Sequence, residues 1–523
     1  MKIEPRFLFL AALPVSVWHG YGHDEQHTAL SQIAAQALTR IHWSAPVDLN
    51  PQLDAYTGEL YVHYGSPVVT AANTILMPVK TVSTDGFEVQ ARNGATGALL
   101  YTLSTDYTLP SHNWVPPYGI VLSAPGDSFG DRAVLPGEDS VRRERPVPEP
   151  LERLYYPGAG GTVYYRDRVD SSAGPVGQIA FYGNTLYSTD QAAFNSAVKI
   201  STPLTADSRG NIYFGFVIQG ANPAGLTSGI ARIAGDGSGS WMSAPAFAGG
   251  DSSITQVALN CAPALSPDQR TIYFAVSDGS GFGSGYLVSA DSTTLAPIAH
   301  TRLQDPRGGL AVVTSDSSAS PTIGPDGDVF FGVLENNLPS HNQRGWMLHF
   351  DASLANVKVP GSFGWDDTPS IVPANLVPSY SGSSAYLILV KYNNYAGSGT
   401  GDGVNKLAIL DPNASQQDEY SATPVEVMHE VLTVTGVTPE PQTGFPNAVR
   451  EWCINSAAID PSAKSALVNS EDGVLYRWDF TTNTLIQSLR LTPGLGEAYT
   501  PTIIGADGTV YAINDSGLFA VGN

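Results

Sequence analysis

The sequence predicts an all-β protein, a closed β-propeller built from four-stranded antiparallel blades. Three observations support this fold class: a strand–turn–strand phrase that recurs along the chain, a composition rich in turn-forming residues, and an N-terminal strand that can complete the last blade. The 523 residues include 53 glycines, 38 prolines and 24 tyrosines, and only 14% of them are charged. This composition favours short strands joined by tight turns over long helices.

The recurring phrase consists of a small residue and proline, a short apolar strand, a turn, and a second strand rich in Tyr, Phe and Val. Its clearest copies are residues 202–214, 262–274, 320–331 and 500–512. The dipeptides Asp326-Gly327 and Asp507-Gly508 supply the positive φ angles of a tight hairpin turn. Each copy therefore predicts the first hairpin of a blade.

Looser copies bring the number of blade starts to eight. The proline of the phrase, or its equivalent, falls at positions 67, 117, 203, 263, 321, 369, 457 and 501. Unequal intervals suit a propeller because insertions enter the loops between strands. We favour eight blades, and the wide intervals after residues 117 and 369 leave seven as the alternative.

The last repeat, from Pro501 to Asn523, has room for only three strands. The segment Arg40 to Ala45 can supply the fourth, which closes the ring and removes the open sheet edges. The sequence therefore predicts a single propeller domain over residues 40–523, preceded by a lead-in over residues 21–39.

Lys2 and Arg6 precede an apolar run, which is typical of a secretory signal peptide within residues 1–20. The predicted location is the secretory pathway or the outside of the cell, with candidate glycosylation sites at Asn413 and Asn514. The formal net charge of −22 repels phosphate backbones and anionic lipids, so nucleic acid and membranes are unlikely partners. The oligomeric state is left open.

The segment Asn93 to Tyr101 reads Asn-Gly-Ala-Thr-Gly-Ala-Leu-Leu-Tyr. It resembles the blade ending of quinoprotein-type (PQQ-like) propeller repeats, with Tyr101 in place of tryptophan. The resemblance spans about residues 40–523 and implies the fold, because propellers serve as binding modules, scaffolds and enzymes alike.

The loops that lead into the inner strands should meet at one mouth of the central channel, and connections between second and third strands should rise over the same face. These loops carry rings that we predict to bind substrate: His63, Trp114, Trp346, Trp365, Tyr392, Trp452 and Tyr499. His341, Arg344 and Lys391 are the candidate catalytic groups beside them. Packing of blade against blade is the alternative role for each of these side chains.

The sequence contains few matches to standard catalytic and cofactor-binding motifs. No serine-hydrolase elbow, zinc-protease helix or phosphate-binding loop occurs in a convincing context. Cys261 and Cys453 occupy similar positions in non-neighbouring blades, so we predict two free thiols. The adjacent cysteine pair and the Glu/Asn/Asp calcium set of large quinone-dependent dehydrogenases are not found. We therefore expect neither a cofactor nor a metal.

The C-terminal runs 451–460 and 497–504, with the signal-like start, are similar to fungal propeller proteins of tropolone sesquiterpenoid biosynthesis. That resemblance implies a cofactor-free pericyclase, a hetero-Diels-Alderase, which dehydrates an aromatic or terpenoid substrate to a quinone methide and promotes its cycloaddition. An aromatic cup with a few polar groups suits such a reaction. The alternative is a non-catalytic secreted propeller that binds a glycan or a protein partner.

Overall fold

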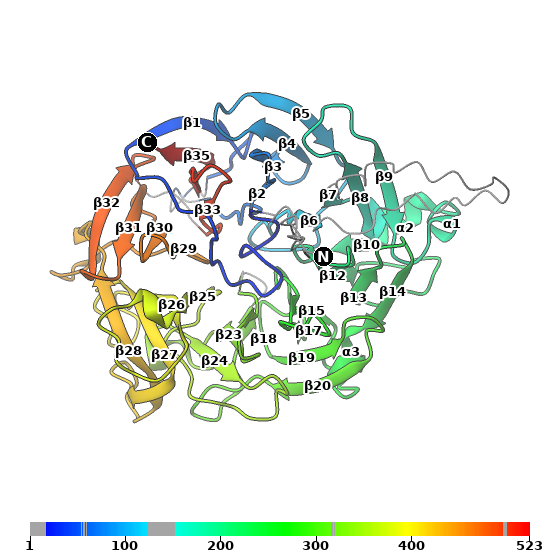
Figure 1. Cartoon of the computed structure of the whole chain (residues 1–523). Coiled ribbons are helices and arrows are strands. Elements are labelled where there is room, and N and C mark those ends of the chain that lie inside the picture. Colours follow the sequence, from blue (N-terminus) through cyan, green and yellow to red (C-terminus); the bar gives the residue numbers. More distant parts are fainter. Residues whose placement is uncertain are drawn as a thin grey trace, which may run out of the picture.

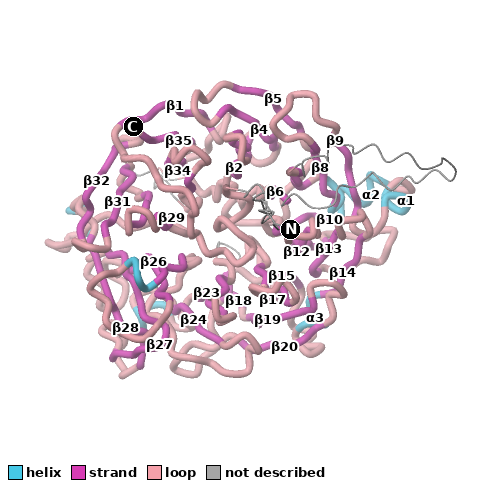
Figure 2. The backbone as a smooth tube through the Cα atoms, in the orientation of Figure 1, coloured by secondary structure: helices cyan, strands magenta, loops and turns pink. Residues whose placement is uncertain are grey.

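The computed structural model describes residues 17–53, 55, 58, 60–123, 152–314, 317, 319–494 and 499–523. Successive sheets stand side by side around a central channel and form a ring (Figure 1). Strands dominate the described chain, and the few helices lie in connections between them (Figure 2). The predicted all-β class is confirmed.

The ring has eight blades, which confirms the favoured count. Blade 1 contains β2 (Val68–Val69), β3 (Thr74–Lys80), β4 (Phe87–Asn93) and β5 (Leu99–Ser104). Blade 2 contains β6 (Val121–Ser123), β7 (Arg153–Pro157), β8 (Thr162–Asp167) and β9 (Val176–Ala180). Blade 3 contains β10 (Val198–Ile200), β11 (Thr205–Ala206), β12 (Ile212–Ile218), β13 (Gly229–Ile233) and β14 (Gly239–Ser243). Blade 4 contains β15 (Gln256–Val257), β16 (Ala264–Leu265), β17 (Thr271–Ser277), β19 (Gly285–Asp291) and β20 (Pro297–Arg302).

The second half of the ring repeats this plan. Blade 5 contains β22 (Thr322–Ile323), β23 (Val329–Val333) and β24 (Trp346–Phe350). Blade 6 contains β25 (Ser370–Pro373), β26 (Tyr386–Tyr392), β27 (Lys406–Gln417) and β28 (Glu426–Thr435). Blade 7 contains β29 (Ala458–Asp460), β30 (Ser465–Asn469), β31 (Val474–Asp479) and β32 (Thr484–Arg490). Blade 8 contains β33 (Ile503–Ile504), β34 (Val510–Asn514), β35 (Gly517–Gly522) and β1 (Arg40–Pro46).

The N-terminal strand closes the ring as predicted. β1 pairs antiparallel with β35, from Arg40 opposite Gly522 to Pro46 opposite Gly517. The first and last strands of the propeller therefore share one sheet, and β1 covers the edge of β35 that would otherwise be unpaired.

Blade 5 departs from the predicted four strands. Its sheet contains three, and residues 357–361 follow β24 only through isolated bridges, Phe350 with Val357 and Met347 with Gly361. A separate two-stranded ladder joins β18 (Phe282–Gly283) to β21 (Val313–Thr314) between blades 4 and 5. The helical segments are α1 (Asn184–Tyr187), α2 (Gln191–Ala197), α3 (Ala244–Phe247), η1 (Ala159–Gly161), η2 (Leu338–His341), η3 (Ala374–Leu376) and η4 (Pro441–Thr443).

Strands within a blade are more buried than the outermost strand, and this difference explains their patterns of apolar and polar residues. β12 reads Ile-Tyr-Phe-Gly-Phe-Val-Ile and is buried at six of its seven positions, because neighbouring blades cover both faces. The outer strand β32 alternates strictly between exposed and half-buried residues, since one face meets solvent. The core therefore lies between the blades. Among the described residues, no helix is long and apolar enough to cross a membrane.

The lead-in lies inside the ring, where the dark blue stretch before β1 runs along the channel (Figure 1). We call residues 17–39 the strap. Seven blades bind the strap through backbone hydrogen bonds of 2.7–2.9 Å. The pairs, blade residue first, are Val69 with Trp18, Leu122 with His19, Leu265 with Glu25, Ile323 with Gln26, Ile371 with Thr28, Ile459 with Ala29 and Gly508 with Gln36. Residues 17–20, inside the range predicted for a signal peptide, are thus part of the fold, and residues 1–16 lie outside the described residues.

Candidate active site

The connections into the inner strands meet at one face of the ring, which we call the mouth. Each inner strand runs from the mouth to a turn at the opposite face, and the second strand returns. The strap is bonded along the inner strands and their turns, so it lies deeper in the channel than the mouth loops. The mouth loops therefore form walls above a floor made by the strap.

An aromatic cluster stands on the walls between blades 8, 1 and 2. The ring centroid of His63 lies 5.1 Å from that of Trp114 and 5.2 Å from that of Tyr499, and Trp114 lies 5.4 Å from Tyr499. Tyr61 packs on Trp114 at 4.7 Å. Three of the predicted binding residues are thus brought together, although their positions in the sequence span more than 430 residues.

A pocket opens beside this cluster. Its lining comprises Tyr21, His63, Tyr64, Ser66, Pro117, Gly119, Ile120, Pro203, Tyr499, Thr500 and Pro501. Apolar walls with a few polar groups are usual for small-molecule sites. Tyr21 comes from the strap, and its hydroxyl lies 2.9 Å from the Thr368 hydroxyl and also donates to Asn455.

Lys391 lies next to the cluster. Its Nζ is 5.6 Å from the ring centroid of Tyr499 and 4.0 Å from Oδ2 of Asp366, and its side chain is 2% exposed. Asp366 has a φ of 52°, a left-handed backbone conformation that costs free energy in a residue with a side chain. The cation is therefore held in a fixed place at the channel wall.

Asp367 follows on the same loop and is 1% exposed. Burial raises the pKa of its carboxyl well above the usual value, Lys391 opposes that rise, and Asp366 adds to it. Its Oδ2 makes no hydrogen bond within the described residues. The Asp367 carboxyl therefore lies in an environment that disfavours its charged form, beside the Lys391 cation and the Asp366 carboxylate.

The other predicted catalytic groups lie elsewhere, between blades 5 and 6. The His341 ring stacks on Trp346 with centroids 3.7 Å apart, and its Nε2 is 3.2 Å from Oδ2 of Asp418. Arg344 donates to the carbonyl of Ser362 at 3.0 Å. His341, Arg344 and Trp346 are all 0% exposed. The structure thus gives these side chains packing contacts and no surface at the mouth.

Rings enclose the Arg344 guanidinium. Its Cζ lies 3.6 Å from the ring centroid of Tyr420, 4.3 Å from that of Tyr392 and 5.5 Å from that of Phe363. Cation–π contacts of this kind stabilise a buried charge, and the Asp418 carboxylate adds an electrostatic attraction to the same guanidinium. Tyr392, predicted to bind substrate, is 1% exposed and belongs to this cage.

The two remaining tryptophans differ in exposure. Trp365 is half-buried and lines a second, small pocket between blades 4 and 5, with Leu259 and Phe331. Trp452 is 1% exposed and packs edge-on against Tyr476 with centroids 5.5 Å apart. Trp365 is therefore available to a ligand, whereas Trp452 contributes to the core.

The two candidate glycosylation sites also separate. Asn413 is exposed, although its Nδ2 donates to Ser384 at 3.0 Å. Asn514 is 0% exposed, and its amide bonds Asn469, Ser470 and Thr492. The prediction of a glycan on Asn514 is not compatible with this fold, because the side chain has no access to solvent.

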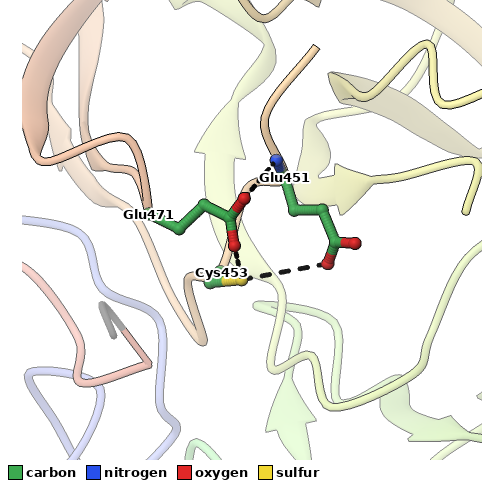
Figure 3. A group of neighbouring side chains, drawn as sticks. All are labelled: Glu451, Cys453 and Glu471. Carbon is green, nitrogen blue, oxygen red and sulfur yellow. Dashed lines mark hydrogen bonds between the residues drawn. The ribbon is translucent and has the colours of Figure 1, made fainter. Parts of the chain in front are cut away.

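A group that the sequence analysis did not select lies at the mouth of blade 7. The carboxylates of Glu451 and Glu471 approach the Cys453 sulfur from opposite sides, and Glu471 lies in the turn between β30 and β31 (Figure 3). The thiol donates to Oε2 of Glu471 at 3.4 Å and lies 4.0 Å from Oε2 of Glu451. Burial raises the pKa of Glu471 to about 7. The alternating pattern Glu-x-Cys in an extended loop was the available signal, because residues two apart face the same side.

Both cysteines are free, as predicted. Cys261, at the mouth of blade 4, is 1% exposed, and its sulfur accepts a hydrogen bond from the Ala275 N–H at 3.4 Å. Burial raises the pKa of its thiol to about 12, which keeps it protonated and unreactive.

Comparison with solved structures shows the same fold. A europium-containing methanol dehydrogenase matches with a TM-score of 0.53 at 9% identity, over 95% of this chain and 90% of that one. The quinohemoprotein alcohol dehydrogenase from Comamonas testosteroni matches with a TM-score of 0.53 at 11% identity, over 99% and 82%. The quinohemoprotein alcohol dehydrogenase ADHIIG from Pseudomonas putida HK5 matches with a TM-score of 0.50 at 11% identity, over 97% and 76%.

The chain therefore has a quinoprotein-type propeller fold. No protein-family model and no curated protein matches its sequence. At these identities the likeness concerns the fold alone.

The residues of the mouth do not fit the metal and quinone groups of such dehydrogenases. The two cysteines sit in blades 4 and 7 as separate free thiols, so they cannot form the adjacent pair. Among the described residues, the group that could hold a metal is Glu451, Cys453 and Glu471. It includes a thiol, whereas hard cations such as calcium take oxygen ligands.

Proposed function

We propose that this protein is an enzyme that binds an aromatic or terpenoid substrate at the mouth, dehydrates it to a quinone methide and promotes a hetero-Diels-Alder cycloaddition. The observation that carries this proposal is the pocket whose wall contains His63 and Tyr499, with Trp114 packed behind them and Lys391 beside Tyr499. Its walls are aromatic rings and prolines, which suit a planar apolar ligand.

The chemistry needs one proton donor and one acceptor. A hydroxymethyl-substituted phenol or tropolone gives its ring hydroxyl proton to a base, and the C–O bond of the hydroxymethyl group breaks. The leaving oxygen takes a proton from an acid and departs as water, which leaves the quinone methide. The base then returns its proton to the acid, so no group of the protein is consumed.

Lys391 is suited to the acid role and His63 to the base role. The ammonium, close to Asp366, would donate to the departing oxygen, and the His63 imidazole lies near the same Tyr499 ring, with centroids 5.2 Å apart. The cycloaddition that follows forms two bonds without any further group. Walls that hold the quinone methide and the alkene together replace a bimolecular encounter, which is a large part of such a barrier.

The test is turnover with a defined pair of substrates. The full chain is incubated with a hydroxymethyl phenol or tropolone and an electron-rich sesquiterpene alkene, and mass spectrometry detects the adduct that has lost one water. We expect Lys391→Gln to lower kcat by about 100-fold, the usual effect of removing one preorganised donor. Lys464→Gln is the matched control, because Lys464 is exposed in the turn that follows β29, on the opposite face.

Two results would overturn the proposal. One is an unchanged rate of adduct formation with and without the protein. The other is equal rates for the Lys391 and Lys464 variants. Saturable binding of a glycan or a protein at the mouth, without turnover, would instead support the non-catalytic alternative.

A further inference from the structure

We propose that Glu451, Cys453 and Glu471 form a binding site for a divalent metal ion of the zinc class at the mouth of blade 7. The site is separate from the pocket beside Tyr499, and the inference does not depend on the function proposed above. It replaces our expectation from the sequence that the mouth holds no metal.

The geometry of the donor atoms supports the site. One thiol sulfur and two carboxylate oxygens all lie within 4.8 Å of one another. A tetrahedral zinc with Zn–S of about 2.3 Å and Zn–O of about 2.1 Å would place its ligand atoms roughly 3.4–3.6 Å apart. The separations from Sγ to the two oxygens are 3.4 Å and 4.0 Å, close to these values, and the two carboxylate oxygens, which lie within 4.8 Å of each other, would move closer together on binding.

Groups outside the donor set orient Glu471. Its Oε1 accepts a hydrogen bond from the Glu451 N–H at 3.1 Å and lies 3.7 Å from Nη1 of Arg450. Arg450 is itself anchored to Glu440 at 2.8 Å. These contacts hold one oxygen and turn Oε2 toward the Cys453 sulfur (Figure 3). Outer contacts that aim a ligand in this way are typical of metal sites.

The loops are rigid at both ends of the site. The Ser470 hydroxyl donates to the Glu451 carbonyl at 3.2 Å, which ties the loop before β29 to the turn before β31. Trp452, between the two donors Glu451 and Cys453, is buried, and its backbone N–H donates a hydrogen bond to Oδ1 of Asn393 at 3.1 Å. The fold therefore brings the donors together, and metal binding requires only local movement of their side chains.

The donor types select the metal. A thiolate with two carboxylates suits a borderline-soft ion such as Zn²⁺, whereas Ca²⁺ and Mg²⁺ take oxygen ligands. Three protein ligands leave the fourth tetrahedral position for water or a ligand oxygen, which is the arrangement of catalytic rather than structural zinc. Cys453 is 5% exposed and Glu471 has 15% of its side chain exposed, so the site is largely shielded from solvent.

The test uses Co²⁺ as a spectroscopic substitute for Zn²⁺. The full chain, treated with a chelator and dialysed, is titrated with Co²⁺, and we expect one equivalent to produce the near-ultraviolet charge-transfer band of a thiolate–cobalt bond. Stoichiometric Zn²⁺ should then abolish the band. Cys453→Ser should remove it completely, and Glu471→Gln should weaken Co²⁺ binding at least tenfold while keeping the thiolate.

Cys261→Ser is the matched control, because Cys261 is the other buried free thiol and has no carboxylate partner among its described contacts. Its band should equal that of the unchanged protein. The near-ultraviolet circular dichroism of each variant checks that it is folded. Absence of a band in the unchanged protein, a band that survives in Cys453→Ser, or one that disappears in Cys261→Ser would overturn the proposal. Loss of the band with adduct formation unchanged would separate this site from the function proposed above.

Discussion

Two aromatic clusters, each with a cation, lie on the mouth side of the ring, and they differ in solvent exposure. The cluster between blades 8, 1 and 2 contains His63, Trp114 and Tyr499 and borders a pocket. The cluster between blades 5 and 6 contains Trp346 and the Arg344 cage and is buried except for the half-buried ring of Tyr420. Both clusters combine aromatic rings with a cationic side chain. Solvent exposure and free space therefore distinguish a candidate ligand site from a packing contact between blades, whereas residue type does not.

The largest expected effect concerns the buried cluster. Arg344→Ala leaves the carbonyls of Ser362 and Asn393 without their donor and opens a cavity between Tyr420 and Tyr392. We expect the free energy of unfolding to fall by about 4 kcal/mol. Urea unfolding followed by circular dichroism measures the loss. Arg344→Lys keeps the charge and should lose less.

This substitution can also break the comparison. If Arg344→Ala left stability nearly unchanged but abolished binding or turnover, the guanidinium would act on substrate, and the two clusters would have the same role after all.

The second effect concerns the floor of the mouth. His27 on the strap is 1% exposed, and its Nδ1 donates to the Pro321 carbonyl at 2.7 Å. Burial lowers the pKa of its imidazole to about 4, although that carbonyl and the charges of Asp24 and Glu25 oppose the fall. The unfolded chain keeps the usual value of about 6.5.

Between these two pKa values the unfolded state holds more protons, so stability falls as the pH drops from above 6.5 to 4. The loss attributable to His27 is roughly 3 kcal/mol, since one pKa unit corresponds to about 1.4 kcal/mol. His27→Asn should flatten the dependence in this window, because asparagine does not titrate and tolerates the φ of 60° found here. Unfolding measured at pH 7 and pH 4 gives the two slopes.

Asp24 offers an internal check on this interpretation. Hydrogen bonds from His23 and Thr28 lower the pKa of Asp24 to about 2 in spite of its burial. Its contribution is therefore present above a pH of about 4 and is lost only below it. An equal slope for His27→Asn and the unchanged protein between pH 6.5 and 4 would contradict the role given to His27.

The sequence was sufficient for the ring but not for what fills it. The predicted prolines Pro67 and Pro501 fall one and two residues before β2 and β33, and β1 closes blade 8 as expected. These features depend on local patterns of turns and alternating strands. The predictions that depend on such local patterns, namely the hairpin starts and the closing strand, are confirmed.

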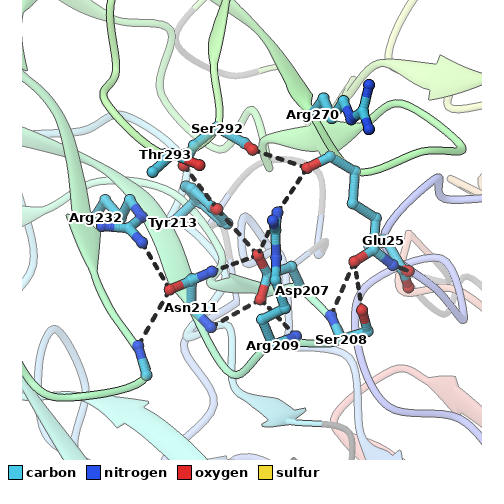
Figure 4. Close-up of polar contacts among 12 residues, drawn as sticks. Glu25, Asp207, Ser208, Arg209, Asn211, Tyr213, Arg232, Arg270, Ser292 and Thr293 are labelled. Carbon is cyan, nitrogen blue, oxygen red and sulfur yellow. Dashed lines mark hydrogen bonds and ion pairs between the residues drawn. The ribbon is translucent and has the colours of Figure 1, made fainter.

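The strap and the choice between pocket and packing depend on contacts between distant residues. Asp207 lies in the phrase copy 202–214 and accepts hydrogen bonds from Asn211 and Tyr213 (Figure 4). The neighbouring Ser208 N–H donates to Gln269, whose amide in turn donates to Glu25 of the strap. No spacing in the sequence links residue 25 to residue 207. His341 and Trp114 likewise look alike in their loops, and only the neighbouring blade decides which of them is covered.

The smallest expected effect tests the pocket itself. Trp114 is half-buried and contacts His63, Tyr61 and Tyr499 through its ring alone. Trp114→Ala should weaken binding of a tropolone or phenol by about tenfold, or 1.4 kcal/mol, because one stacking surface is lost. Trp365→Ala is the matched control, since Trp365 is equally half-buried but lines the other pocket. If calorimetry gave equal losses for both, substrate would span the channel from blade 1 to blade 5; if only Trp365→Ala weakened binding, the pocket between blades 4 and 5 would be the ligand site, and the comparison drawn here would have to be reversed.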